Sequence, residues 1–264
     1  SRIAQQTGIK VVSNFRHADI CAGGQGAPLV PAFHHYVFHC SKRNRVVVNI
    51  GGIANITILP KQKQQTVTGF DTGPGNGLMD AWIKQCKQLN YDRNGALAAS
   101  GKTDNRLLNT LLKDDYFQLA PPKSTGFETF NLHWLTAQLN RLADNNRNDA
   151  DVQSTLCDVT AISIINAINQ YADDSDEIFI CGGGVHNKEL MQRLQALIPT
   201  PVVSTDILGI NPDWVEAMTF AWLAKRRLDK LPGNIPDVTG ADKAVVLGEL
   251  TCIDNRTDEK DAHC

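Results

Sequence analysis

The chain has 264 residues, enough to bury a substantial core in one large domain or in two lobes. Its hydrophobic content of 42% and charged content of 20% are ordinary for a globular protein. A formal net charge of -2 provides no basic field for nucleic acid. No run of 18 apolar residues predicts a membrane span, and the first residues lack the apolar core of a signal peptide.

Seven cysteines are spread through the chain without any CxxC pair. They are Cys21, Cys40, Cys86, Cys157, Cys181, Cys252 and Cys264. An odd number without CxxC spacing argues against a disulfide framework and against a zinc ribbon. We therefore expect reduced thiols and a cytoplasmic location.

Short elements open the chain. A helical end at Ile3–Gln6 stops at Gly8, a strand covers Lys10–Phe15, and a loop spans Gly23–Pro28. A meander of three strands follows, at Arg45–Ile50, Ile53–Leu59 and Thr66–Asp71. Enrichment in Val, Ile and Thr supports all three strands.

The remaining elements alternate between helices and strands. Helical spacing of apolar residues predicts helices at Leu78–Leu89, Asn105–Leu112, Leu132–Leu142 and Val152–Tyr171. The strands Glu177–Cys181 and Pro201–Thr205 then alternate with the helices Lys188–Leu197 and Asp213–Leu228. A meander followed by this alternation is the order of the ribonuclease-H-like unit, the half-molecule of actin-like ATPases.

Glycine-rich turns follow three of the predicted strands. Gly51 and Gly52 make either an ordinary hairpin turn or a close approach of the backbone to a ligand. Gly182, Gly183 and Gly184 resemble a phosphate loop. That loop lacks the Lys-Ser/Thr of a P-loop and the spacing of a Rossmann fingerprint.

The turn between the third strand and the following helix carries an acid. Asp71 ends the strand, Gly73, Gly75 and Asn76 crowd beside it, and the helix that begins near Asn76 or Leu78 offers free N–H groups to a phosphate. Asp71 caps the turn, takes a proton from a nucleophile, or holds a metal-bound water.

Glu216 is a lone carboxylate in a helix that is apolar on nearly every face. Burying it unpaired would cost several kcal/mol, so we expect either a structural partner or a polar cleft. His35 and His39, with Cys40, have helical spacing, but no third metal ligand is evident, so no metal site is predicted. The basic run Lys225–Arg227 is typical of a solvated helix end.

Several stretches together resemble the anhydro-N-acetylmuramic acid kinase family of the sugar kinase/Hsp70/actin superfamily. They are "GGQGAPLVPAFHH", "VVNIGGIANIT", "GFDTGPGNGLMDAWI", "PPKSTGFETFN", "CGGGVHN" and "NPDWVEAMTFAWLA". The resemblance implies an α/β actin-like ATPase fold with two lobes. It also implies ATP and Mg²⁺ as cofactors, and the opening and 6-O-phosphorylation of 1,6-anhydro-N-acetylmuramic acid in cell-wall recycling.

The resemblance also implies roles for individual residues. Asp71 would be the general base that deprotonates the attacking water, while Glu216 and Gln25 would contact the sugar. The nucleotide would lie against Gly51, Gly52, Asn55, Gly73, Gly75, Asn76, Gly182, Gly183, Gly184 and Asn187. Two alternatives stay open: a non-catalytic Hsp70-like ATP-binding module, and a plain amino-sugar kinase whose base deprotonates a sugar hydroxyl. A small amino sugar is the expected partner, and a homodimer is left open.

The resemblance also has gaps. Phe127 stands where it implies an arginine, and Asn14 where it implies an aspartate. No "GTSLDG"-like phosphate loop is present, so we expect an incomplete first lobe, and no activity from residues 1–264 alone. The expected division assigns 1–22 and 243–250 to that lobe, 23–242 to the second lobe, and 251–264 to a polar tail.

Overall fold

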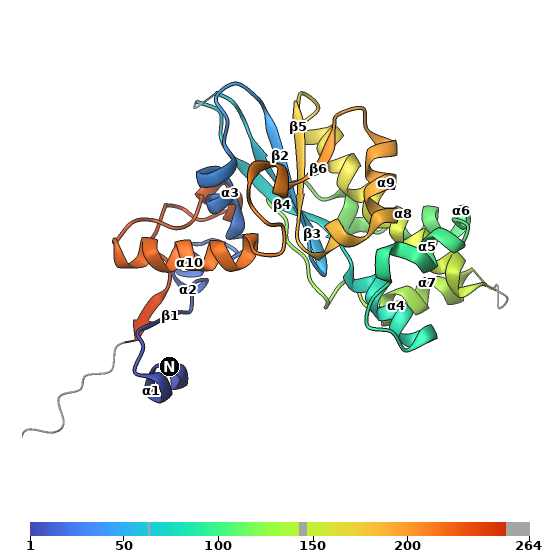
Figure 1. The fold of residues 1–264 in the computed structure, drawn as a ribbon, viewed down its shortest axis with the longest axis horizontal. Coiled ribbons are helices and arrows are strands. Elements are labelled where there is room, and N and C mark those ends of the chain that lie inside the picture. Colours follow the sequence, from blue (N-terminus) through green and yellow to red (C-terminus); the bar gives the residue numbers. More distant parts are fainter. Residues whose placement is uncertain (63, 143–146, 252–264) are drawn as a thin grey trace, which may run out of the picture.

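The computed structural model describes residues 1–62, 64–142 and 147–251. A five-stranded sheet with the order β4–β3–β2–β5–β6 lies at its centre (Figure 1). The strands are β2 (Arg45–Ile50), β3 (Ile53–Leu59), β4 (Thr68–Pro74), β5 (Glu177–Cys181) and β6 (Val202–Ser204). The strand β3 pairs antiparallel with both β2 and β4, whereas β5 runs parallel to β2 and to β6. This is the ribonuclease-H-like arrangement that the element order predicted, and the α/β fold class is confirmed.

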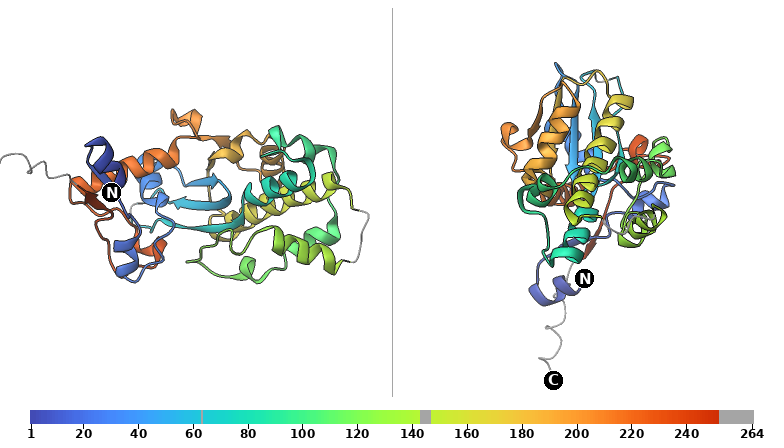
Figure 2. Two further views of the ribbon diagram at one scale, coloured as in Figure 1. Left: turned by 90° about the horizontal axis from the view of Figure 1, so that it is seen from below. Right: turned by 90° about the vertical axis from the view of Figure 1, so that its right-hand side faces the viewer.

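Helices cover both faces of the sheet. The long helix α8 (Asp149–Tyr171) packs on one face, with α4 (Gly77–Lys87) and α9 (Lys188–Leu197) beside it. The helices α3 (Val30–Phe38) and α10 (Val215–Leu228) lie on the other face. Figure 2 shows this layering from two further sides. Side chains alternate between the faces of a strand, so each face of the sheet has its own core.

The two cores divide the residues of β2 between them. Val46, Val48 and Ile50 pack under α8, while Val47 packs with Phe33 and Phe38 of α3. All four of these β2 side chains are fully buried. The sheet is therefore buried on both sides along β2, as its continuous apolar run requires.

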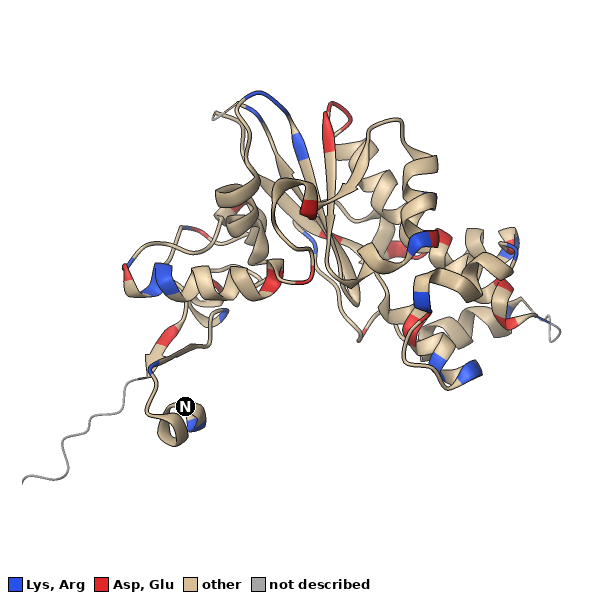
Figure 3. Ribbon diagram, in the orientation of Figure 1, with Lys and Arg blue, Asp and Glu red and all other residues tan. Residues whose placement is uncertain are grey.

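Short elements complete the fold. Beyond the sheet the helices are α5 (Ala96–Ser100), α6 (Asn105–Leu111), α7 (Leu132–Arg141) and α11 (Pro236–Thr239). The 3₁₀ turns are η1 (Arg93–Gly95), η2 (Asp115–Gln118), η3 (Gly183–His186) and η4 (Thr205–Leu208). Lys and Arg are interspersed with Asp and Glu over these elements (Figure 3). Among the described residues, no helix combines the length and apolarity that crossing a bilayer requires.

Segments near the start and near the end of the described chain meet at one end of the molecule (Figure 1). The helices α1 (Arg2–Thr7) and α2 (His17–Cys21) lie there, and β1 (Val11–Ser13) pairs antiparallel with β7 (Glu249–Thr251). Asn14 follows β1 in the left-handed region at φ 55° and donates to Glu249 over 2.7 Å. Asparagine tolerates this conformation better than most residues. The expected polar tail covers residues 251–264. Thr251 is described and ends β7, whereas residues 252–264 lie outside the described part of the chain.

Three expectations about the elements need correction. The strand β4 does not end at Asp71 but continues to Pro74, with a register shift opposite Ala54 and Asn55. The helices α2 and α3 were not predicted, although Pro31 near the start of α3 is a typical first-turn residue. The helix α8 begins at Asp149, three residues before the predicted start, because the Asn148 side chain caps it.

Candidate active site and nucleotide pocket

A row of polar side chains crosses four strands of the sheet. The register pairs Asp71 with Asn55, Asn55 with Asn49, and Asn49 with Cys181. Directly paired residues point to the same face of a sheet, and each strand adds roughly 4.8 Å. The row therefore extends over roughly 14 Å on the face that α3 and α10 partly cover. It begins at the acid that the sequence singled out.

Asp71 is a buried acid held by backbone groups. Its exposed fraction is 8%, and its Oδ2 accepts a hydrogen bond of 2.9 Å from the N–H of Thr125. Its backbone carbonyl accepts from the hydroxyl of Tyr116 over 2.6 Å. Burial raises the pKa of Asp71 to about 6, and the Thr125 N–H and nearby Arg16 oppose that rise. Such a carboxyl is ionised at neutral pH and accepts a proton more readily than an exposed aspartate.

Two buried polar atoms near Asp71 lack a partner among the described residues. They are Oδ1 of Asn55, its cross-strand neighbour, and Oγ1 of Thr125, whose N–H binds it. Buried polar groups in native proteins nearly always have partners, so unpaired ones require an explanation. A polar ligand bound beside the Asp71 carboxylate would provide such partners.

The loop that carries Gln25 is held over this site by Asp19. The carboxylate of Asp19 is fully buried and accepts from the Gly26 N–H, the Asn234 amide and the Thr239 hydroxyl, at 2.7–2.8 Å. The exposed Gln25 then accepts from the Ser124 hydroxyl over 3.0 Å, next to Thr125. Gln25 therefore reaches the segment that binds Asp71. The importance of Asp19 was missed from the sequence.

Glu216 lies beyond the other end of the polar row. Its charge raises the pKa of the buried Cys181 thiol, after the larger effect of burial. The side chain of Glu216 is exposed, and it makes no hydrogen bond or ion pair with any described residue. The helix α10 buries only Val215, Thr219 and Leu223, so most of its apolar surface is not buried in the core. Of the two alternatives for Glu216, the structure therefore excludes a partner within the described chain.

The first glycine turn and the start of α4 are bonded to each other. The N–H groups of Gly75 and Gly77 donate to the Gly52 carbonyl, and the Asn76 N–H donates to the Gly51 carbonyl, at 2.8–3.0 Å. These three N–H groups are therefore engaged. The expectation that the start of this helix offers them free to a phosphate is wrong for all three.

Phe127 covers the same junction. Its exposed fraction is 63%, yet its ring lies directly against the backbone of Gly52 and Gly77. A Cβ atom on either glycine would overlap the ring. Glycine at these two positions is thus needed for the close approach of Phe127, and the residue that the sequence marked as unusual lies in the site.

We expect Gly75→Ala to destabilise the fold far more than Gly51→Ala. A Cβ on Gly75 would overlap the Gly51 carbonyl and approach the Ala54 N to 3.1 Å, and both are backbone atoms that cannot rotate away. A Cβ on Gly51 meets nothing closer than 3.7 Å. Overpacking of this kind costs roughly 1–3 kcal/mol or more, measurable by urea denaturation. Equal midpoints for the two variants would contradict this account of the turn.

A pocket of about 440 Å³ brings three of the expected nucleotide-binding residues together. Asn76, Gly183 and Asn187 line it, and Tyr91 and Arg93 from the segment before α5 face them. Gly182 and Gly184 do not line it, because both pack against Ile50 at the end of β2. This size is typical of a small-molecule site, and Arg93 supplies a positive charge.

Asp80 lines the same pocket and was not expected from the sequence. Burial raises its pKa to about 6, and the nearby charge of Asp92 adds to the effect. Asp92 itself is engaged, since it accepts from the N–H groups of Leu97 and Ala98 at the start of α5. A perturbed carboxyl in a pocket is typical of a functional site, though one lone acid in a helix gives little signal in a sequence.

The residues that the structure describes do not form a protein cage for a metal ion. Within the described ranges, no group of three His, Cys, Asp or Glu side chains could share one. The His35 and His39 rings lie 5.0 Å apart, and partial burial and His39 lower the pKa of His35.

Comparison with known proteins assigns the chain to a family. A family model described as anhydro-N-acetylmuramic acid kinase matches residues 1–252. Anhydro-N-acetylmuramic acid kinase of Shewanella oneidensis is 55% identical over 247 residues, or 93% of this chain. The same kinase of Coxiella burnetii is 48% identical over 249 residues, or 94% of this chain. The chain spans 66% of the length of each relative.

Solved structures also show similarity at low sequence identity. Xylulose kinase from Rhodospirillum rubrum aligns at 14% identity over 86% of this chain and 45% of its own, with a TM-score of 0.45. The activator of 2-hydroxyisocaproyl-CoA dehydratase from Clostridium difficile aligns at 10% identity over 72% of this chain and 62% of its own, also with a TM-score of 0.45. Because the family model covers residues 1–252 of 264, the chain belongs to the anhydro-N-acetylmuramic acid kinase family.

Proposed function

We propose that the complete protein is an ATP-dependent kinase that opens 1,6-anhydro-N-acetylmuramic acid with water and phosphorylates its 6-oxygen. The buried carboxylate of Asp71, with the unpaired Asn55 Oδ1 and Thr125 Oγ1 beside it, carries this proposal. Together they provide a proton acceptor and two polar contacts for a hydroxylated ligand. The family membership supplies the substrate.

In the proposed reaction, Asp71 takes a proton from a water molecule as that water attacks the anomeric carbon. The bond from this carbon to the bridging oxygen breaks. The bridging oxygen, now the 6-oxygen, attacks the γ-phosphorus of ATP, the bond from that phosphorus to the β-phosphate oxygen breaks, and ADP leaves. The Thr125 N–H fixes Oδ2 of Asp71, which leaves Oδ1 for the water. Gln25 and Glu216 would contact the sugar from the two ends of the polar row.

The nucleotide would lie in the pocket of Asn76, Gly183 and Asn187, with Arg93 facing its phosphates. Mg²⁺ would be held chiefly by those phosphates, with Asp80 the one acid of the pocket available to it, and would neutralise developing charge. The remaining nucleotide assignments stay proposals: Gly51, Gly52, Asn55, Gly73, Gly75, Gly182 and Gly184. A cytoplasmic location is also proposed, supported by five free cysteines among the described residues. A homodimer stays a prediction.

Product analysis separates this function from a plain amino-sugar kinase. The proposed reaction adds both a water and a phosphoryl group, and it creates a reducing end. A plain kinase adds only the phosphoryl group. Mass spectrometry of the product formed by the complete protein, together with a reducing-end assay, distinguishes the two. A product that keeps the anhydro bridge would refute the proposal.

The activity should fall in acid because the proposed base becomes protonated. With the pKa of Asp71 raised to about 6, half of the free enzyme would lose its base near that pH. We expect kcat/KM to decrease about tenfold for each pH unit below 6 and to level off above 7. A profile that is flat between pH 5 and pH 8 would argue against Asp71 as the base.

Glu216→Gln should weaken sugar binding or turnover while leaving stability almost unchanged. The side chain is exposed and unpaired within the described chain, so its removal breaks no contact that supports the fold. Asp206→Asn, at another exposed acid, is the matched control. Steady-state kinetics and thermal melting measure both effects. If Glu216→Gln matched the control in KM and kcat, Glu216 would have no role in the site.

A further inference from the structure

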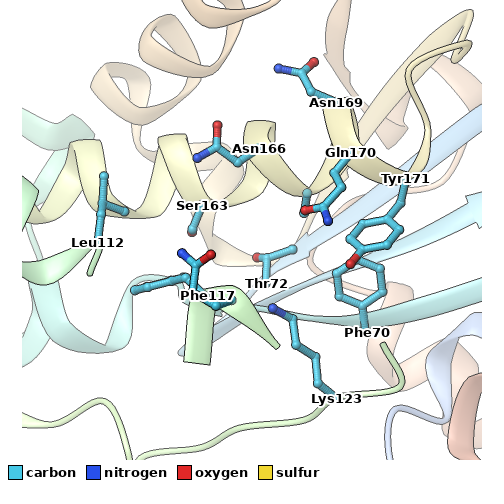
Figure 4. A pocket seen from close by; sticks show the side chains of 12 residues that line it. Phe70, Thr72, Leu112, Phe117, Lys123, Ser163, Asn166, Asn169, Gln170 and Tyr171 are labelled. Carbon is cyan, nitrogen blue, oxygen red and sulfur yellow. The ribbon is translucent and has the colours of Figure 1, made fainter. Parts of the chain in front are cut away.

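A second pocket lies on the face of β4 opposite to the Asp71 carboxylate. Phe70 and Thr72, the neighbours of Asp71 in the strand, line it together with Lys123 and residues of α8 (Figure 4). Its volume is about 420 Å³, within the range of roughly 300–1,000 Å³ usual for small-molecule sites. Side chains alternate between the faces of a strand, so this pocket is separate from the proposed sugar site.

Lys123 brings a positive charge to this pocket without a counter-ion. Its Nζ donates to the Tyr116 carbonyl over 3.1 Å and lies 4.7 Å from the centre of the Tyr116 ring. No carboxylate of the described chain forms an ion pair with it. In Figure 4 the ammonium group points into the pocket. A half-buried cation with only a carbonyl and aromatic partners is suited to binding an anion.

Polar side chains of α8 surround the mouth of the pocket. Asn166, Asn169 and Gln170 are exposed there, and their side chains make no hydrogen bond with any other described residue. Their amides offer both donors and acceptors. The rings of Phe70 and Phe117 also line the pocket, on opposite sides of the Lys123 ammonium group in Figure 4. One cation, several free amides and aromatic lining match a small molecule with an anionic group, hydroxyls and an apolar ring face.

We propose that this pocket binds a hydroxylated small-molecule oxyanion, a sugar phosphate or a sugar acid, with the anionic group on Lys123. The pocket is also linked to Asp71 through the backbone. The Lys123 carbonyl accepts from the Asp71 N–H over 3.2 Å, and the Tyr116 hydroxyl donates to the Asp71 carbonyl. A bound anion would therefore contact Lys123, which holds the Asp71 N–H and in turn contacts Tyr116, which holds the Asp71 carbonyl. The binding proposal itself does not depend on the kinase activity.

The test titrates the complete protein by calorimetry with three probes: glucose 6-phosphate, glucuronate and uncharged glucose. We expect one or both anions to bind at millimolar concentration and glucose to bind more weakly. Lys123→Gln should weaken anion binding about tenfold or more, since charge-assisted hydrogen bonds are among the strongest. Lys84→Gln, at an exposed lysine of α4, is the control for loss of one charge.

Two further variants keep the result interpretable. Asn166→Asp places a negative charge at the mouth from an exposed position of α8, so it should fold normally and repel the anion even if Lys123→Gln does not fold. Asp71→Asn should retain anion binding, which separates this pocket from the proposed sugar site. Equal affinities for Lys123→Gln and Lys84→Gln, or no binding of either anion at millimolar concentration, would overturn the proposal.

Discussion

Asp71→Asn is expected to lower the turnover of the complete protein by 10²–10⁴-fold, the usual contribution of a general base. Asparagine keeps the size of the side chain and can still accept the hydrogen bond from the Thr125 N–H. It cannot take a proton from water. Binding of ATP and sugar should therefore persist while kcat falls, which steady-state kinetics and calorimetry would show.

Asp80→Asn is the matched control for this experiment. Its carboxyl also has a pKa raised to about 6 by burial, but it lies in the proposed nucleotide pocket. We expect this variant to change the KM for ATP and to keep the acid limb of the pH profile. A near-normal kcat for Asp71→Asn would mean that Asp71 only holds the segment around Thr125.

The Asp71→Asn variant should also be more stable than the wild type at neutral pH. The pKa of Asp71 is raised from 3.8 to about 6, so folding favours its protonated form. The stability that this group contributes is fully present below pH 3.8 and is lost as the pH rises through 6. A shift of this size corresponds to about 3 kcal/mol. The stability gap between the asparagine variant and the wild type should therefore open between pH 4 and pH 7.

The strands were predictable where local chemistry alone determines them. Arg45–Ile50 and Ile53–Leu59 have the predicted bounds, because β-branched residues flank a Gly-Gly turn. The end of β4 was not predictable in this way. Gly73 has a φ of 146° and continues the strand because the neighbouring β3 shifts register there. That register is a property of the paired strands rather than of either sequence.

The candidate site also contains residues that the sequence predicted and residues that only the structure revealed. Asp71 was found because an acid among glycines stands out, and Asn76, Gly183 and Asn187 because they follow strands. The alignment of Asn49 with Asn55 and Asp71 required the register of three strands. The engaged N–H groups at the start of α4 also required the fold, since their acceptors lie more than 20 residues away in sequence.

Asp19→Ala is expected to be among the most destabilising substitutions in the chain. The carboxylate is fully buried and accepts three hydrogen bonds, two of them from side chains more than 200 residues away, Asn234 and Thr239. Removing it leaves three buried donors unpaired, and each unpaired buried donor costs roughly 1–3 kcal/mol. We therefore expect a loss of roughly 3 kcal/mol or more in the free energy of unfolding, measured by urea denaturation.

The more conservative variant Asp19→Asn tests whether Asp19 also positions Gln25 in the proposed sugar site. Asp19→Asn keeps the volume but replaces one acceptor with a donor, which would face another donor. The loop from Gly24 to Gly26 would then lose its anchor at Asp19. As a result, Gln25 would lose its hydrogen bond with Ser124. The variant should raise the KM for the sugar more than that for ATP, because the nucleotide pocket shares no residue with this loop. Asp237→Ala, at an exposed acid of α11, is the control. If Asp19→Asn left both KM values unchanged while lowering stability, Asp19 would support the fold without positioning Gln25.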